Sequence, residues 1–525
     1  MADEAEPIVL TFGGGINIRR RPMDIDINEC TLGENFDLSP EQLALQKRAP
    51  FDLAGTAPNG QAINGLAQLI KRDGTITTLV QAGTTVYSWD GASTFTSVGT
   101  VLAGTKLRGP REQIFSLDDL VLITDLAKID VVKKWDGTTF SDLAHNLGTT
   151  FLAKYCRVFN ERAVFANVKS GTSDLPHMLI VSERENSQTL TVTDRPAGTL
   201  SLADPVFLLT PDLKPINGLE EGFGKMLFST THGRLYALSG TSAFDYSADP
   251  FYAGSTVAGD EAMVNIGNDI AMGLRGRIET LSGTINFGDV EANDLSRDIA
   301  PLIETVTDWT LAYDQRKQRL ICFPDNVSAA YVYYKSIGVQ NVSPWSKWTT
   351  GHQVGMQPTT VMALTDPDSG EDRVYFGDTV GRIFKFDGSG GTDGGTTTVA
   401  LSRTSGLIRG IPEGNVMDVE GWVVYRREFE ATVTLTFQFA GEGLFDKSIT
   451  VNLPATDSIP VYNGEGDNAG YYAGDFYYGA SFAERLNRQG FGPPGLNAWF
   501  QVKVDVSSEG DANIQEIGIK FRTAA

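Results

Sequence analysis

The sequence predicts an all-β protein, a β-propeller followed by a C-terminal domain of β-sandwich or jelly-roll type. Long helical patterns are nearly absent, and short apolar or alternating runs end at Gly, Asp or Asn, as in strands joined by hairpins. One strand ending recurs along the first three quarters of the chain. Beyond residue 395 the alternating runs become longer, which indicates a different β architecture.

The recurring ending reads aliphatic, two variable residues, large apolar, Asp or Ser, Gly. The Asp-Gly or Ser-Gly step is typical of hairpin turns. Positions one and four of the pattern fall on opposite faces of a strand, so either a bulge or a strand buried on both faces is required. The five copies are 86–91, 132–137, 235–240, 278–283 and 383–388.

The large apolar residues of these copies are 46, 103, 43 and 105 positions apart. Because the long gaps are about twice the short ones, each is expected to contain a degenerate copy, at 179–183 and at 331–335. A period of about 40 to 50 residues is typical of propeller blades. The spacing predicts about seven blades, with six as the alternative; chance recurrence of hairpin endings is the competing interpretation.

Three segments follow from this pattern: an N-terminal arm with the first strands (1–50), the propeller (51–395) and a sandwich-like domain (396–525). Residues 388–395 have the composition of a flexible linker. Hairpins are expected where 225–230 face 234–238 and where 374–376 face 383–386. The longer strands of the last segment are expected at 419–425, 431–439, 499–506 and 514–521.

Two surfaces are candidates for subunit or adaptor contact. One is the basic run Arg19, Arg20 and Arg21, whose other interpretation is a solvated arm. The other is the aromatic and Gly-rich loop 462–495, because Tyr combines apolar area with a polar tip; a loop packed on itself is the alternative. Its candidate contact residues are Tyr471, Tyr472, Phe476, Tyr477 and Tyr478.

The net charge of −22 disfavours ordinary nucleic-acid binding, yet it suits a wall past which DNA slides without sticking. The acidic start has no positively charged region before an apolar stretch, so no signal peptide is expected. No apolar run approaches the roughly 20 residues of a membrane helix. We therefore expect a protein made in a cytoplasm, without membrane insertion.

Signatures of catalysis, cofactor binding and metal binding are missing from the sequence, so no enzyme is expected. The cysteines Cys30, Cys156 and Cys322 are too far apart for a zinc site and predict buried free thiols. Acidic clusters at 24–29 and 366–372 are interpreted as solvated strand and hairpin, although the alternating carboxylates of the first could hold a cation. A facing pair of acids for glycoside hydrolysis stays possible, but the Asp-box repeat of sialidases is absent.

Several N-terminal motifs resemble the opening of the tail nozzle (tail tubular) proteins of short-tailed bacteriophages. They are Phe12-Gly-Gly-Gly-Ile-Asn17, Pro22-Met-Asp-Ile25, Glu34-Asn-Phe-Asp-Leu38 and Gln46-Lys-Arg-Ala-Pro50, in which Ala49 interrupts the last motif. A weaker similarity continues to about residue 400, whereas the C-terminal segment matches only in style.

The resemblance implies a structural virion protein with a propeller and appended β domains. In that family six copies form a ring below the adaptor, and DNA is ejected through the lumen without specific binding. It implies a homohexamer in the viral tail, with the adaptor and a tail fibre or tailspike as partners, made in the host cytoplasm. The alternatives are a receptor- or glycan-binding tail component and, less favoured, a tail-associated glycosidase.

Overall fold

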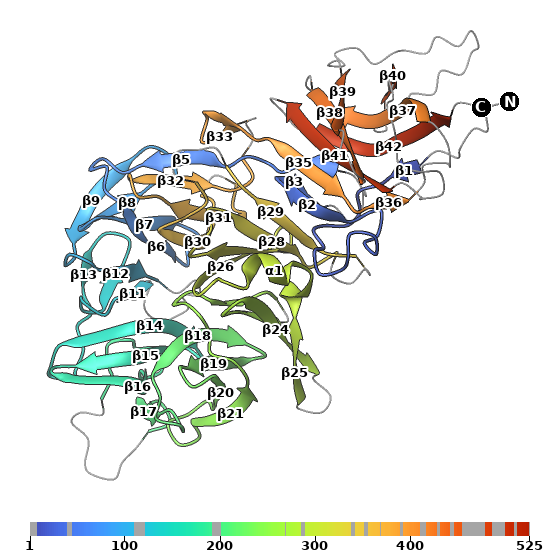
Figure 1. The fold of residues 1–525 in the computed structure, drawn as a ribbon. Helices are drawn as coiled ribbons and strands as arrows, with labels where there is room; N and C mark the ends of the chain where they lie inside the picture. Colours follow the sequence, from blue (N-terminus) through green and yellow to red (C-terminus); the bar gives the residue numbers. More distant parts are fainter. Residues whose placement is uncertain are drawn as a thin grey trace, which may run out of the picture.

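The computed structural model is an all-β protein in which groups of four antiparallel strands succeed one another around a common centre, as in a β-propeller (Figure 1). The predicted fold class is confirmed at this level. The helices in the described part of the chain are a 3₁₀ turn, η1 (Leu295–Ile299), and a single turn, α1 (Ala300–Ile303). The structure describes residues 8–38, 45–109, 121–191, 201–267, 269–284, 289–337, 342–350, 355–367, 369–388, 392–409, 416–427, 431–440, 446–453, 478–485, 499–508 and 512–523.

Each group of the propeller except the last has its strands in chain order, from the centre outward. The first strands of neighbouring groups contact one another, except that the first strand of the third group contacts the second strand of the group before it. The first three groups consist of β6 (Ile63–Ile70), β7 (Ile76–Ala82), β8 (Thr85–Trp89) and β9 (Phe95–Thr100); β10 (Leu107–Arg108), β11 (Val121–Asp125), β12 (Lys133–Trp135) and β13 (Phe140–Asp142); β14 (Phe151–Phe159), β15 (Arg162–Ser170), β16 (Ser173–Val181) and β17 (Val206–Leu209). The next groups are β18 (Ile216–Gly222), β19 (Lys225–Thr230), β20 (Arg234–Ser239) and β21 (Ser247–Ala253); β22 (Met263–Asn265), β23 (Asp269–Leu274), β24 (Arg277–Thr284) and β25 (Asp289–Asp294); β26 (Trp309–Asp314), β27 (Arg319–Pro324), β28 (Ala330–Tyr334) and β29 (Trp345–Trp348).

The last group takes its outer strand from the beginning of the chain. Strands β30 (Thr360–Thr365), β31 (Asp372–Gly377) and β32 (Arg382–Lys385) are followed in the sheet by β5 (Asp52–Thr56). Strand β5 pairs antiparallel with β32, from Arg382 opposite Thr56 to Lys385 opposite Asp52. Both ends of the repeating region are therefore held in one sheet.

The recurring strand ending lies on the third strand of each group, including 179–183 on β16 and 331–335 on β28. Positions one and four of this ending lie on opposite faces of the strand, and both expected explanations apply: the strand is buried on both faces, and its pairing is irregular. Val86 packs in the apolar cluster shared with the following group, whereas Trp89 packs against Tyr375 of the last group. The pairing with the fourth strand shifts just after position one, at 86/87, 235/236 and 383/384. The two predicted hairpins are confirmed by the β19–β20 and β31–β32 pairs.

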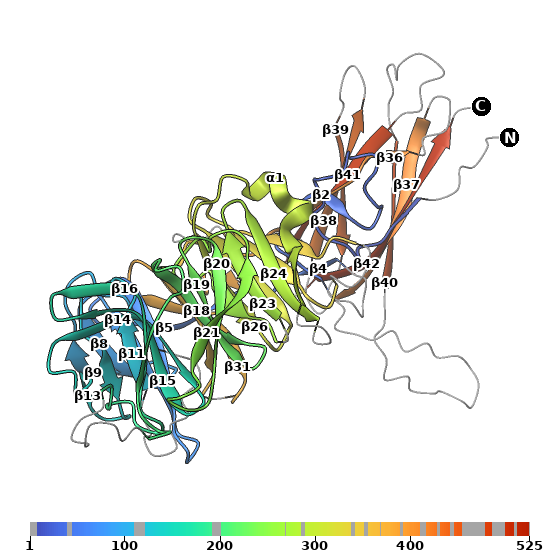
Figure 2. The same cartoon turned by 90° about the horizontal axis from the view of Figure 1, so that it is seen from below.

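The remaining strands extend two sheets at the far end of the molecule from β8 and β16 (Figure 2). The four longer strands predicted after residue 395 lie within β37 (Val416–Arg427), β38 (Ala431–Ala440), β41 (Trp499–Ser508) and β42 (Ala512–Thr523). One sheet continues from β29 through β2 (Cys30–Glu34), β35 (Leu401–Ser405), β41 (Trp499–Ser508), β38 (Ala431–Ala440) and β39 (Asp446–Leu453), with β36 (Ile408–Arg409) beside β41. The other contains β3 (Phe36–Asp37), β4 (Leu45–Lys47), β42 (Ala512–Thr523), β37 (Val416–Arg427), β40 (Tyr478–Arg485) and β1 (Ile8–Leu10); β33 (Thr392–Asp393) and β34 (Thr397–Thr398) form a separate pair.

The N-terminal arm shares these sheets with the C-terminal segment. Strand β1 pairs with β42, β4 pairs with β42, and β2 lies between β29 and β35. These pairings join residues that are hundreds of positions apart in sequence. The division into 1–50, 51–395 and 396–525 stays a prediction.

The three cysteines are buried and free. Burial raises the pKa of the Cys30 thiol to about 11, against the opposing effect of Arg403, and that of Cys156 to about 12. The thiolate is the reactive form, so native protein should label very slowly with a disulfide reagent at pH 8. We expect all three thiols to react within minutes after unfolding in urea. Rapid stoichiometric labelling of native protein would contradict this burial.

Candidate functional site

The predicted contact residues divide into a described and an undescribed set. Arg19, Arg20 and Arg21 are exposed on the arm between β1 and β2. Tyr471, Tyr472, Phe476 and Tyr477 lie outside the described residues, and Tyr478 begins β40 but its side chain is not described. The prediction that these two sets form a contact surface therefore stays a prediction.

The motif around Asn35 forms a buried junction between the arm and the propeller. Asn35 has a φ of 60°, a conformation that Asn tolerates better than most residues. Its Oδ1 accepts hydrogen bonds from Arg48 Nε at 2.9 Å and from the Thr349 backbone N–H at 2.8 Å. Its Nδ2 donates to the Ala400 carbonyl at 2.8 Å. One side chain thus connects the arm, the end of β29 and the segment before β35.

Arg48 extends this junction to Asp393. The guanidinium pairs in bidentate fashion with the Asp393 carboxylate at 2.9 and 2.5 Å, and both side chains are buried. The Arg48 guanidinium also lies over the rings of Phe51 and Trp348. Residues 392–395 therefore differ from the expected flexible linker, because Asp393 is buried and the Gly394 N–H donates to the Phe51 carbonyl.

A second buried cluster surrounds Arg319 on β27. Its Nη2 lies 2.6 Å from Asp314 Oδ2 and 2.6 Å from Asp387 Oδ2, and its Nη1 lies 3.5 Å from Asp37 Oδ2. Asp387 comes from the recurring strand ending and Asp37 from the arm motif. Burial alone would raise the pKa of Asp387, but Arg319 and Lys317 outweigh it and hold that pKa well below its usual range.

The glycine run of the arm is fixed by close backbone contact. The Gly15 N–H donates to the Ser343 carbonyl at 2.6 Å, and the next N–H, of Ile16, donates to the Trp345 carbonyl at 2.8 Å. A Cβ at Gly15 would overlap the Trp345 carbonyl oxygen. Only glycine permits this approach of the two backbones.

We expect Gly15→Ala to lower the free energy of unfolding by about 1–3 kcal/mol or more, because a backbone carbonyl cannot move aside as a side chain can. Gly14→Ala is the matched control: its nearest neighbour would be the Glu29 side chain, so a smaller loss is expected. Urea unfolding of both variants measures the difference. Equal midpoints for the two variants would contradict the close contact at Gly15.

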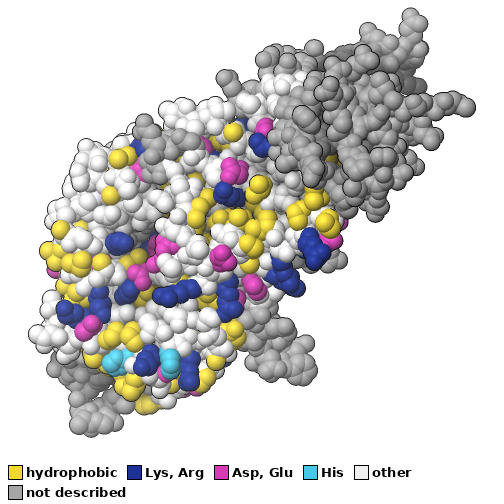
Figure 3. Space-filling view, in the orientation of Figure 1, with side chains coloured by type: hydrophobic (Ala, Val, Ile, Leu, Met, Phe, Trp, Pro, Cys, Tyr) yellow, Lys and Arg dark blue, Asp and Glu magenta, His cyan; other side chains and the backbone are white. Residues whose placement is uncertain are grey.

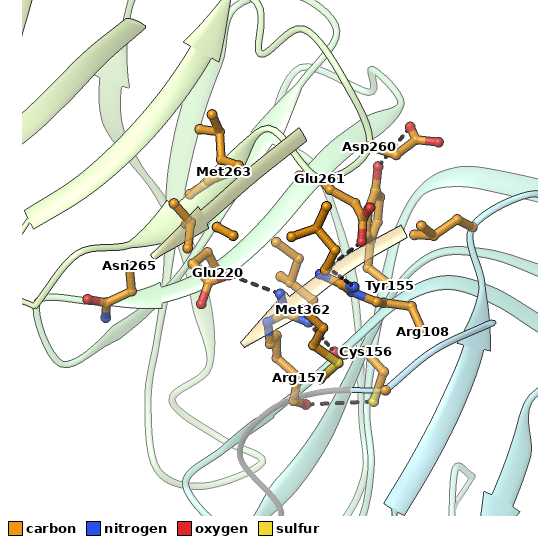
Figure 4. A pocket seen from close by; sticks show the side chains of 18 of the residues that line it. Arg108, Tyr155, Cys156, Arg157, Glu220, Asp260, Glu261, Met263, Asn265 and Met362 are labelled. Carbon is orange, nitrogen blue, oxygen red and sulfur yellow. Dashed lines mark hydrogen bonds and ion pairs between the residues drawn. The ribbon is translucent and has the colours of Figure 1, made fainter. Parts of the chain in front are cut away.

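The centre of the propeller contains a cavity of about 120 Å³ (Figure 4). Arg108 reaches across it, with Nη2 2.8 Å from Glu261 Oε1 and Nη1 2.6 Å from the Val361 carbonyl. Arg157 on β14 pairs with Glu220 on β18 at 2.9 Å. Figure 4 shows both arginines pointing towards their carboxylates between the first strands. Ion pairs between different groups therefore cross the centre of the propeller.

Desolvation dominates the electrostatics of this cavity. Burial raises the pKa of Glu261 and lowers the pKa of Arg108, and each partner opposes the shift of the other. The mouth is more open, since Lys154 Nζ lies 2.6 Å from Asp260 Oδ1, whose side chain is half exposed. The sequence signal for this cluster is the presence of Lys154, Arg157 and Glu220 within largely apolar strands, a pattern that belongs to no catalytic motif.

The outer surface shows no continuous patch of one charge on the described face in Figure 3, where basic and acidic side chains lie side by side across the middle.

The expected acidic strand at 24–29 is instead a series of turns, and Glu29 is buried. Among the described residues, no group of three His, Cys, Asp or Glu side chains is placed to hold a metal ion. In the same part of the chain, no helix has the length and apolar character to cross a membrane.

No family model and no curated protein matches the sequence. Solved structures with a similar arrangement include the extracellular domain of a one component system from B. thetaiotaomicron, at 12% identity and a TM-score of 0.41, covering 70% of this chain and 42% of that one. The present chain thus spans less than half of that protein's length. Others are the Pan2 WD40 domain of Neurospora crassa (10%, TM-score 0.39, covering 65% and 95%) and the WD40 domain of Toxoplasma gondii coronin (9%, TM-score 0.37, covering 68% and 86%). These TM-scores are all below 0.5, and the strand pairing of the chain itself defines its fold.

Proposed function

We propose that the chain is a structural virion protein, the tail nozzle of a short-tailed bacteriophage. The main support for this proposal is that the residues that carry the resemblance make buried structural contacts. Gly15, Asn35, Asp37 and Arg48 all make buried contacts that tie the arm to the propeller or to the C-terminal strands. Motifs of this kind specify an architecture rather than a reaction, which suits a scaffold.

We propose further that the propeller has seven blades and that the C-terminal strands form a β-sandwich. Seven four-stranded groups each have a copy of the recurring ending on their third strand. The apolar cluster around Ile63, Val80, Met362 and Tyr375 packs the last group against the first, which supports a closed ring. The two sheets built on β41 and β42 support the sandwich.

In this proposal, six copies form the ring below the adaptor, and DNA passes through the lumen of the ring. The axis of each propeller is a poor route for DNA, because the Arg108–Glu261 and Arg157–Glu220 pairs cross it and the cavity between them measures only about 120 Å³. The net charge of −22 per chain would keep phosphates from adhering to the lumen wall. Arg19 to Arg21 and the aromatic loop are the proposed contacts with neighbours, adaptor, fibre or spike.

Electron microscopy of the purified chain, alone and with a tail adaptor protein, tests this proposal. A closed six-membered ring with an open centre, seated on the adaptor, is the expected result. A monomer that forms no ring and binds no adaptor would count against the nozzle. Binding of host polysaccharide without cleavage would then favour the receptor-binding alternative, and release of reducing ends would favour the glycosidase.

A further inference from the structure

A hollow of about 370 Å³ lies where the N-terminal arm crosses the corner between β25 and η1. The arm is fixed there by the Ile18 N–H, which donates to the Asp298 carbonyl at 3.0 Å. Asn17 and Glu29 line the hollow from the arm, and Asp298 lines it from η1. This hollow is separate from the propeller axis and from the Arg48 and Arg319 clusters.

The floor of the hollow contains a buried hydrogen-bond acceptor, Asn17 Oδ1, without a donor among the described residues. Asn17 is 2% exposed; its Nδ2 donates to Glu29 Oε2 at 2.9 Å, and its Oδ1 has no partner among the described residues. Glu29 Oε1 accepts from the Ser343 N–H at 2.6 Å. In the described part of the chain, no basic side chain lies within 4.0 Å of the Glu29 or Asp298 carboxylate, and Arg20 and Arg297 act on Asp298 only from a greater distance. A buried acceptor left unpaired costs free energy that a bound donor would recover.

The pKa shifts of the two carboxyl groups also favour a bound cation in this hollow. Burial raises the pKa of Glu29, although the hydrogen bonds from Ser343 and Asn17 oppose the shift, and nearby Asp298 raises it further. Burial likewise raises the pKa of Asp298, although a hydrogen bond from Ser343 and the charges of Arg20 and Arg297 oppose the shift. Two desolvated carboxylates close together favour an added cation that can also donate hydrogen bonds.

The rim has the opposite charge. Arg19, Arg20 and Arg297 line the hollow and are exposed. A ligand that placed a cation on the floor would therefore meet guanidinium groups at the mouth. A carboxylate next to that cation would pair with them, since arginine suits carboxylates in two-point contact.

We propose that this hollow binds a basic side chain of a partner polypeptide, an arginine or lysine, with an adjacent acidic residue held by the rim arginines. The guanidinium or ammonium would donate to Asn17 Oδ1 and to the Asp298 and Glu29 carboxylates. A free polyamine shares the cation but has no carboxylate for the rim. The inference does not depend on the nozzle proposal, because it rests on the local geometry of the arm.

Calorimetric titration of the full chain with three probes tests the site: acetyl-Arg-Glu-amide, acetyl-Arg-Gln-amide and agmatine. The first is expected to bind most tightly. Asp298→Asn should weaken its binding by about tenfold or more, the effect of losing one charge-assisted hydrogen bond. Glu29→Gln should weaken it similarly. Asp174→Asn, which changes an exposed carboxylate on β16, is the matched control and should leave binding unchanged.

Arg20→Gln should remove the preference for the Glu over the Gln peptide while agmatine binding persists. The inference would be overturned by absence of peptide binding at millimolar concentration, or by equal binding to the Asp298→Asn and Asp174→Asn proteins. If agmatine bound as tightly as acetyl-Arg-Glu-amide, the proposal of a partner polypeptide would be overturned, and the ligand of the hollow would be a free amine. Urea midpoints close to that of the unsubstituted protein show that each variant tested is folded.

Discussion

Arg319→Met is expected to lower the free energy of unfolding by about 3–5 kcal/mol, because it leaves buried carboxylates without their shared cation. Arg319 is fully buried and joins Asp314 of β26, Asp387 after β32 and Asp37 of the arm. Its loss therefore affects two neighbouring groups of the propeller and the arm at once. The urea unfolding midpoint at pH 7 measures the effect.

Arg316→Gln is the matched control. Arg316 also pairs with Asp387, at 2.5 Å, but its side chain is 34% exposed, so its loss should cost less than about 1 kcal/mol. A loss as large as that of Arg319→Met would contradict the importance of burial in this cluster.

Acidification should reduce the difference between Arg319→Met and the unsubstituted protein. The pKa of Asp387 is depressed in the folded state, so its contribution to stability is present above the unfolded pKa, about 3.9, and is lost as pH falls further. The two unfolding midpoints should therefore lie closer together at pH 3 than at pH 7. A constant difference across this range would show that packing, rather than the ion network, explains the effect.

Arg48→Met should cost a similar amount, about 3–5 kcal/mol, because Asp393 would stay buried without a cation. Asp393→Leu alone should also be strongly destabilising, because the buried Arg48 guanidinium would lose its carboxylate partner and the Phe51 N–H would lose its acceptor. Combining both changes should cost less than the sum of the two, by about 0.5–3 kcal/mol. Additive losses would show that the bidentate pair is not the source of the effect.

The local features of the fold could be predicted from the sequence. Alternating side chains and the Gly, Asp and Asn residues that close them located the hairpins of β19–β20 and β31–β32. The recurring ending marked third strands, including the degenerate copies on β16 and β28. These signals are readable because strand faces and turn types depend on residues that are neighbours in the chain.

Contacts between distant residues could not be predicted in this way. The pairing of β5 with β32 and of β2 with β35 joins segments more than three hundred residues apart, and no local pattern specifies such partners. The same holds for Asp393, whose Gly-rich surroundings indicated a linker but whose carboxylate is buried against Arg48. For Glu29, an alternating acidic run indicated a strand where the chain forms turns.

The sequence by itself determined that this is a β protein built from a repeated hairpin unit, because strand period and turn chemistry are local properties. The tertiary structure decided which strands close the sheets, since backbone pairing can join any two edges that the fold brings together. It also decided which charges are buried. Arg108, Arg319 and Arg48 look like ordinary surface residues in the sequence, and only their carboxylate partners from distant segments make them part of the interior.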